Sequence, residues 1–170
     1  MGASTLTLAA QDDGGVSEFG TPYHWEKGTI VVELPERPAG QESVLGLTVP
    51  KMGVVRVGFV GLGMRGPGAV ERFTHIPGTQ IVALCDYERS RAEACQSYLR
   101  KANFAPAAIY SGEKGYEELC KRPDIDLVYI AADWLHHFPI AKCALENGKN
   151  VAIEVPSAMN LKECWALVNL

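Results

Sequence analysis

A short apolar run that ends in closely spaced glycines constrains the fold of this chain more than any other feature. Residues 54–60, VVRVGFV, are typical of a buried parallel strand, and Gly61, Gly63 and Gly66 follow in a G-x-G-x-x-G pattern. Pro67 then stands where helices accept proline, in the first turn. A buried strand, a tight glycine turn and a helix together predict the first unit of a parallel α/β sheet.

Strand and helix patterns alternate four times after residue 53. The predicted strands cover 54–60, 80–86, 126–132 and 150–156, and the predicted helices cover 68–76, 88–102, 115–123, 137–149 and 160–170. Gly148 has the position of a left-handed helix cap, and Asn160 and Glu163 have the spacing of a capping box. This order predicts a Rossmann-type, doubly wound parallel sheet over residues 53–170.

The ends of the chain carry two further expectations. Residues 1–52 are rich in Gly, Pro, Ser and Thr with one β-like run, GTIVVEL, which predicts an extended N-terminal arm. Doubly wound dinucleotide folds usually have about six strands, and no stop signal follows residue 160. We therefore expect a Rossmann domain that is incomplete at its C-terminus and precedes an α+β substrate domain.

Composition and charge exclude several function classes. The net charge of −4 and the absence of a Lys/Arg-rich run argue against nucleic-acid binding. The chain contains no uninterrupted apolar stretch of about 18 residues, so we expect no membrane span. Five scattered cysteines without a C-x-x-C pair predict buried free thiols and no metal site. If residues 1–15 are a trimmed signal segment the protein is periplasmic or secreted; if they are a plain leader it is cytoplasmic.

The glycine loop has the chemistry of a pyrophosphate site. The glycines permit a tight turn, a close approach of backbone to phosphate, and packing of the helix on the strand. The helix then directs its free N–H groups at the phosphates. Asp86 ends the next predicted strand, 20 residues after Gly66, where a carboxylate accepts hydrogen bonds from the adenosine ribose and repels a 2′-phosphate. We therefore expect NAD rather than NADP; the alternative is a plain strand–turn–helix with a surface aspartate.

Two further sequences stand at the carboxyl ends of predicted strands, where open α/β sheets bind ligands. AADWLHHFP contains Trp134 and the adjacent pair His136 and His137. These histidines are either site residues or polar surface, and no spaced acidic or thiol partner indicates a metal. Glu154, in IEVP, either faces the solvent or faces the nicotinamide.

The motifs, taken in order, resemble a known superfamily. G-x-G-x-x-G, CD, AADWLH and ALENGKNVAIEVP are similar to the NAD(P) domains of the glucose–fructose oxidoreductase / inositol dehydrogenase superfamily. Two departures stand out: the T-P-N triplet of that pattern is Ala131-Ala132-Asp133, and the lysine of its E-K-P is Val155. VRVGFVGLGMRG, DWLHH, AIEVPSAMNLKECWALV and RPAGQESVLGLTVPK most resemble its NAD-dependent glycoside hydrolases, which act on α-N-acetylgalactosaminides.

This resemblance implies a redox-assisted glycosidase. NAD⁺ oxidises the sugar at C3, elimination expels the aglycone, water adds, and C3 is re-reduced. It implies a small-molecule or glycan substrate, and it does not decide whether the protein forms a homo-oligomer. No catalytic residue is assigned, since the family's acid/base residues lie beyond Leu170. The implied cofactor-binding residues are Gly61, Gly63, Met64, Arg65, Gly66, Asp86, Trp134, Leu135, His136, His137, Glu154 and Val155.

Two other functions stay open from the sequence. An NAD-dependent sugar or polyol dehydrogenase is the first, and Val155 argues against it because a valine side chain cannot exchange a proton. A non-catalytic nucleotide-binding module is the second. Three outcomes distinguish these functions. Steady accumulation of NADH with a sugar indicates the dehydrogenase, and release of an aglycone without net NADH indicates the glycosidase. NAD binding with neither activity indicates the binding module.

Overall fold

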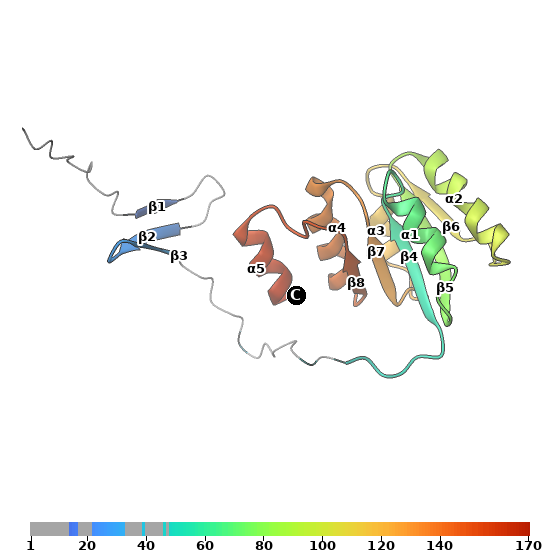
Figure 1. Ribbon diagram of the computed structural model, residues 1–170, viewed down its shortest axis with the longest axis horizontal. Coiled ribbons are helices and arrows are strands. Elements are labelled where there is room, and N and C mark those ends of the chain that lie inside the picture. The colour runs from blue at the N-terminus through green and yellow to red at the C-terminus, as the bar shows by residue number, and fades with distance from the viewer. Residues whose placement is uncertain (1–13, 17–21, 33–38, 40–45, 47) are drawn as a thin grey trace, which may run out of the picture.

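A five-stranded parallel sheet is the centre of the computed structural model, which describes residues 14–16, 22–32, 39, 46 and 48–170. The strand order is β6-β5-β4-β7-β8 (Figure 1). The chain reverses its direction of travel across the sheet between β6 and β7, and β4 is the strand from which both halves grow. The strand bounds are β4 Val55–Val60, β5 Thr79–Asp86, β6 Ala108–Ser111, β7 Leu127–Ile130 and β8 Asn150–Ile153.

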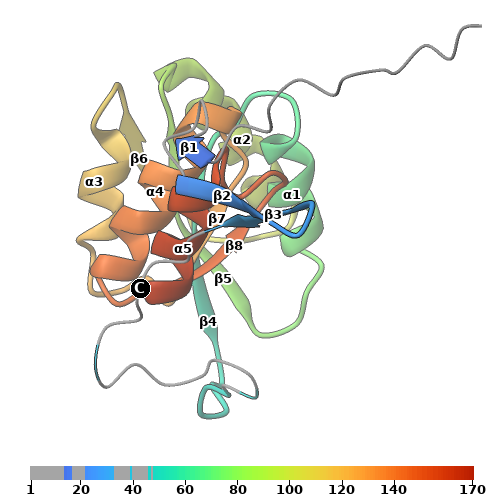
Figure 2. The same cartoon turned by 90° about the vertical axis from the view of Figure 1, so that its left-hand side faces the viewer.

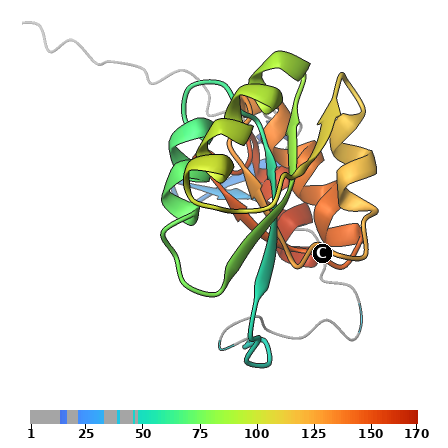
Figure 3. The ribbon, with the colours of Figure 1, turned by 90° about the vertical axis from the view of Figure 1, so that its right-hand side faces the viewer.

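Helices cover both faces of the sheet. On one face, α1 (Gly66–Phe73) and α2 (Arg89–Lys101) pack on the strands, and the other face carries α3 (Gly115–Cys120) and α4 (Trp134–Glu146), as Figure 3 shows. The last helix, α5 (Leu161–Asn169), contacts α4. Each face has its own buried cluster of apolar side chains, so the strands are apolar on both sides, as parallel sheets require.

The predicted Rossmann-type fold is confirmed, with two corrections to its elements. The short edge strand β6 was not predicted, because AIYS is only four residues long and lies between a proline and a glycine. Helix α4 begins at Trp134 rather than at residue 137, because the Asp133 carboxylate accepts a hydrogen bond from the Leu135 amide and caps the helix earlier.

The predicted caps are present. Gly148, which follows the Asn147 cap of α4, has φ of +69°. Asn160 Oδ1 accepts a hydrogen bond from the Glu163 amide at 2.9 Å, and the Glu163 carboxylate accepts from the Met159 amide at 2.7 Å. The second bond falls one residue before the helix cap, so the motif is a slightly shifted capping box.

The N-terminal region contains a small antiparallel sheet of β1 (Gly14–Val16), β2 (Pro22–Glu26) and β3 (Thr29–Val32), drawn in blue in Figure 2. Lys27 and Gly28 join β2 to β3 with positive φ angles, the geometry of a two-residue hairpin turn. The expected β-like run therefore pairs within a hairpin. The predictions for the leader at 1–13 and for most of the arm at 33–47 lie outside the described residues. None of the described helices has the length and apolarity to cross a membrane.

Candidate cofactor site

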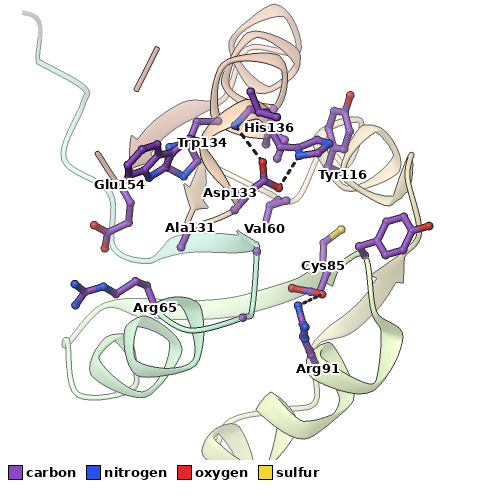
Figure 4. A pocket seen from close by; sticks show the side chains of 18 of the residues that line it. Val60, Arg65, Cys85, Arg91, Tyr116, Ala131, Asp133, Trp134, His136 and Glu154 are labelled. Atoms are coloured by element: carbon purple, nitrogen blue, oxygen red, sulfur yellow. Dashed lines mark hydrogen bonds and ion pairs between the residues drawn. The ribbon is translucent and has the colours of Figure 1, made fainter. Parts of the chain in front are cut away.

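One pocket lies at the carboxyl ends of β4, β5, β7 and β8 (Figure 4), where the doubly wound topology predicts ligand binding. The ends of these strands and the loops after them bring together residues that are up to 95 positions apart in the sequence, from Val60 to Val155. All predicted cofactor residues but one line this pocket: Gly61, Gly63, Met64, Arg65, Asp86, Trp134, Leu135, His136, His137, Glu154 and Val155. The exception, Gly66, lies directly beneath the loop.

The glycine loop forms a cradle that side chains would fill. Gly61 has φ of +90°, and a Cβ there would lie 2.3 Å from the Ala132 nitrogen. At Gly66 a Cβ would lie 2.0 Å from the Gly61 oxygen, so α1 can approach the loop only without it. At Gly63 a Cβ would meet only the Arg91 guanidinium, at 3.7 Å, and would otherwise project into open pocket space.

The start of α1 is left free for an anion. No side chain caps this helix, its first turn contains no acidic residue, and a proline occupies the first turn. Its first N–H groups and the positive end of its dipole are therefore available to a phosphate group. Together with the open space at Gly63, this fits a dinucleotide pyrophosphate.

Asp86 is one of two polar residues that are buried in the described part of the chain. Its carboxylate accepts hydrogen bonds from the Leu62 amide at 2.6 Å and from the Glu88 amide at 2.9 Å. Leu62 belongs to the glycine loop and Glu88 precedes α2, so the carboxylate ties the ends of β4 and β5 together. A carboxylate has about four lone-pair positions, so it keeps capacity for ribose hydroxyl groups.

The Asp133 carboxylate, part of the departure from the T-P-N pattern, holds a histidine. His136 Nδ1 lies 2.6 Å from Asp133 Oδ2, and the other oxygen caps α4. Burial raises the pKa of Asp133, but the hydrogen bonds from His136 and from the Leu135 and His136 amides outweigh it and lower that pKa. Asp133 is therefore ionised at neutral pH, and it favours the His136 tautomer with hydrogen on Nδ1.

His137 is buried, which excludes the surface interpretation for this residue. Its Nδ1 lies 2.7 Å from the Pro156 carbonyl oxygen, which only accepts, so Nδ1 carries the hydrogen. In the neutral ring Nε2 is then an acceptor, and it has no hydrogen-bond partner among the described residues. Buried acceptors are normally paired. An unpaired one beside the pocket fits a ligand that brings N–H or O–H donors, as a nicotinamide carboxamide and ribose do.

Glu154 lines the pocket, and a hydrogen bond from a neighbouring tyrosine fixes its carboxylate. Its Oε1 accepts a hydrogen bond from the Tyr129 hydroxyl at 2.7 Å. Burial, and then this bond, raise the pKa of Tyr129, so the hydroxyl stays protonated and continues to donate. Val155 beside it is 83% exposed at the mouth of the pocket and offers no proton. The solvated interpretation of Glu154 is therefore less favoured than the pocket-facing one.

Cys85 lines the pocket but is not a nucleophile. Burial, and then the Asp86 charge, raise the pKa of its thiol to about 12. The thiol is therefore protonated at neutral pH, and only a thiolate attacks readily. The part of the chain that the structure describes contains no group of three or more His, Cys, Asp and Glu side chains arranged to hold a metal ion.

Several side chains of this pocket, four charged or polar ones among them, were not predicted from the sequence. Arg91, Tyr116 and Glu113 line the pocket outside the recognised motifs, and Asp133 lies within one but was given no role. Asp133 carried a detectable signal, because an aspartate directly before a helix is a capping residue. Arg91 lies on α2, directly after β5. Glu113 and Tyr116 lie around the start of α3, and the packing of β6 beside β5 brings these two to the pocket.

Comparison with known proteins places this geometry in a family. A family model described as "Oxidoreductase family, NAD-binding Rossmann fold" (GFO_IDH_MocA) matches residues 55–170. The chain belongs to this oxidoreductase family. Its Rossmann domain is an NAD-binding domain, in agreement with the expected cofactor. The roles of the individual pocket residues in this member of the family stay predictions.

Several similar proteins are named as members of glycosyl hydrolase family 109. Glycosyl hydrolase family 109 protein 5 of Phocaeicola vulgatus is 82% identical over 151 residues, which are 89% of this chain and 29% of that protein. Glycosyl hydrolase family 109 protein 1 of Bacteroides fragilis is 59% identical over 165 residues, 96% of this chain and 34% of that protein. The chain of this family member thus spans about a third of the length of these curated relatives.

The solved structure of a dehydrogenase is also similar. The myo-inositol dehydrogenase of Lactobacillus casei, in complex with NAD(H) and myo-inositol, superposes with a TM-score of 0.60 at 29% identity. The match covers 68% of this chain and 32% of that one. The pocket at the strand ends, the free helix start and the buried aspartate are the features of this family member that would hold the dinucleotide.

Proposed function

We propose that this chain is the NAD-binding part of a glycosidase that hydrolyses terminal α-N-acetylgalactosamine through transient oxidation of the sugar at C3. The observation that carries the proposal is the 82% identity to a glycosyl hydrolase family 109 protein over 151 residues, 89% of this chain. The departures of Asp133 and Val155 from the dehydrogenase pattern agree with it, because they fall at the nicotinamide end of the site.

Bound NAD would supply the redox chemistry that these side chains lack, namely a transient oxidation of the sugar at C3 that acidifies the C2 proton for elimination of the aglycone and is reversed after water has added. The residues of this chain would bind the cofactor and orient it. The glycine loop and the start of α1 would bind the pyrophosphate, and Asp86 would accept from the adenosine ribose.

The other end of the pocket is arranged for orientation and exclusion of bulk water. The His137 Nε2 acceptor and the carboxylate of Glu154 offer fixed hydrogen-bonding positions to the nicotinamide riboside. Trp134, Leu135 and Val155 are exposed apolar side chains at this end, and they would shield the reacting face once the substrate is bound. The acid and base that act on the sugar are assigned to no residue of this chain.

An NAD-dependent sugar or polyol dehydrogenase is the second candidate. The 29% identity to the myo-inositol dehydrogenase structure favours it. Val155 argues against it, because it occupies the position of the lysine that serves as acid/base partner in the sugar dehydrogenases that the chain resembles.

Hydrolysis of 4-nitrophenyl α-N-acetylgalactosaminide by the full-length protein tests the proposal. We expect nitrophenol release without net formation of NADH. In D₂O the released sugar should carry deuterium at C2, because the C2 proton is removed and replaced from solvent. A glycosidase that uses two carboxylates leaves C2 untouched. Accumulation of NADH with a free sugar would instead establish the dehydrogenase, and hydrolysis without deuterium at C2 would overturn the redox route.

A further inference from the structure

Arg91 is a pocket cation that no motif assigns. It lies in the first turn of α2, and its Nη1 is 3.6 Å from Asp86 Oδ1. Figure 4 shows it directed at that carboxylate, away from Trp134 and Glu154. The Cβ that Gly63 lacks would lie 3.7 Å from the same nitrogen, so the guanidinium also lies alongside the glycine loop.

Asp86 does not depend on Arg91 for its position. The two backbone amides of Leu62 and Glu88 already hold both carboxylate oxygens, and the side chain is only 6% exposed. The Arg91 side chain, in contrast, is 55% exposed, and its distance to Asp86 exceeds that of a hydrogen bond. A guanidinium has five N–H donors in a planar fork, and this one keeps them available for a ligand.

The placement has a consequence for cofactor choice. The carboxylate at the end of β5 is where a Rossmann domain meets the adenosine 2′ position, and an arginine nearby is how such domains accommodate a 2′-phosphate. Arg91 is therefore in reach of that position, with the bidentate geometry that phosphate groups favour. Glu113 lines the same pocket and adds negative charge. Of the two arginines that line the pocket, Arg91 is the one beside Asp86, so attraction for a 2′-phosphate at this position comes from Arg91.

We propose that Arg91 is a specificity-determining residue that forms a latent 2′-phosphate site, and that the Asp86 charge beside it keeps this site closed to NADP. With Asp86 in place, a 2′-phosphate meets a buried carboxylate before it can be neutralised. Without that charge, Arg91 captures the phosphate. NAD selectivity is thus a property of the pair rather than of the aspartate alone.

A double-mutant cycle in the full-length protein tests this. Four proteins are compared: wild type, Asp86→Ser, Arg91→Leu and the double variant. Each is incubated with equal concentrations of NAD⁺ and NADP⁺ until its bound nucleotide has exchanged, and the nucleotides released on denaturation are then quantified. We expect Asp86→Ser to raise the bound NADP/NAD ratio at least tenfold, and Arg91→Leu to remove most of that gain, because charge-assisted phosphate contacts typically contribute about tenfold or more in affinity.

Arg89→Leu is the matched control. Arg89 lies on the same turn of α2, but it is paired with Glu93 at 2.8 Å and does not line the pocket. In the Asp86→Ser background it should leave the ratio unchanged. Equal loss of the gain with Arg89→Leu and Arg91→Leu, or a gain that survives Arg91→Leu, would overturn the proposal.

Two further measurements keep the test decisive. Asp86→Asn, which keeps an acceptor oxygen for the loop amides, replaces Asp86→Ser if thermal melting shows that the serine variant is unfolded. In the wild-type background, Arg91→Leu should shift the ratio further towards NAD, and a shift towards NADP would contradict the proposal. The readout is nucleotide binding, so it holds whether or not the protein is a glycosidase.

Discussion

At the scale of single residues, the most informative contact is the hydrogen bond from Tyr129 to Glu154. Tyr129 packs its ring against Phe59 and Phe73, with centroids 5.3 and 5.4 Å away, in the cluster beneath α1. Its hydroxyl emerges from this apolar cluster at the Glu154 carboxylate. The tyrosine thus restricts Glu154 to one orientation and leaves its second oxygen for the pocket.

Tyr129→Phe keeps the ring and removes only this hydrogen bond. We expect a loss of about 1 kcal/mol in NAD binding, a few-fold weaker affinity, because Glu154 becomes free to rotate. Calorimetric titration of the full-length protein measures it. Tyr110→Phe is the control: its hydroxyl accepts from Arg122 at 3.2 Å and does not line the pocket, so affinity should not change. Identical affinities for Tyr129→Phe and wild type would show that Glu154 needs no support.

At the scale of elements, the β4–α1 unit separates a packing glycine from a binding glycine. Gly66 is where helix meets loop, and its missing Cβ would collide with the Gly61 carbonyl. Gly63 is where the loop meets the ligand, and its missing Cβ would enter the pocket. The motif predicts these separate roles, a close approach to phosphate and packing of the helix on the strand, and the geometry of the packed unit agrees with them.

This difference predicts opposite outcomes for two alanine variants. Gly66→Ala should destabilise the domain by about 1–3 kcal/mol, since backbone must move to admit the methyl group. Gly63→Ala should leave the melting temperature of the unliganded protein unchanged and should weaken NAD binding roughly tenfold or more, because the methyl group occupies ligand space. Thermal melting and NAD titration of both variants give the comparison. A stable Gly66→Ala protein with normal NAD affinity would contradict the assignment.

At the scale of the whole molecule, the two ends of the sheet are built differently. At the amino end, the Asp126 carboxylate accepts three hydrogen bonds from Arg56, through the backbone amide at 2.8 Å, Nε at 2.9 Å and Nη2 at 2.6 Å. This links β4 to the segment before β7. The carboxyl end has the open pocket instead. The amino end therefore stabilises the sheet, and the carboxyl end is open to a ligand.

The Arg56–Asp126 pair predicts a dependence of stability on pH. Its hydrogen bonds lower the pKa of Asp126 below the unfolded value of about 4. The stabilisation is therefore fully present above about pH 4 and is lost as the pH falls through the lower folded pKa. Asp126→Asn should cost about 2 kcal/mol at pH 7, and the difference from wild type should shrink below pH 4.

Thermal melting of both proteins across this pH range measures the effect. Glu146→Gln is the control, because Glu146 pairs with Lys142 on the exposed surface of α4, where ion pairs contribute little. A difference between wild type and Asp126→Asn that stays constant down to pH 3 would show that the carboxylate charge is not what stabilises the sheet.

The sequence by itself determined the order of elements and the identity of the cofactor loop. The apolar side chains at 54–60, 80–86, 126–132 and 150–156 are removed from water only in a sheet that is buried on both faces. The glycines between a strand and a helix indicate a tight turn at that point. Local patterns suffice for such features because they depend on neighbours in the chain. The same logic fails for AIYS, whose pairing with β5 is a tertiary event.

The tertiary structure alone decided how the polar side chains of the pocket are buried and hydrogen-bonded. Arg91, Tyr129 and Asp133 carry no motif in common, and His136 and His137 are adjacent in sequence yet differ completely in burial. One histidine is held by a carboxylate at the surface and the other is enclosed beside the pocket. Burial and hydrogen bonding depend on atoms from distant segments, and those atoms meet only when the strands that carry them are assembled into one sheet.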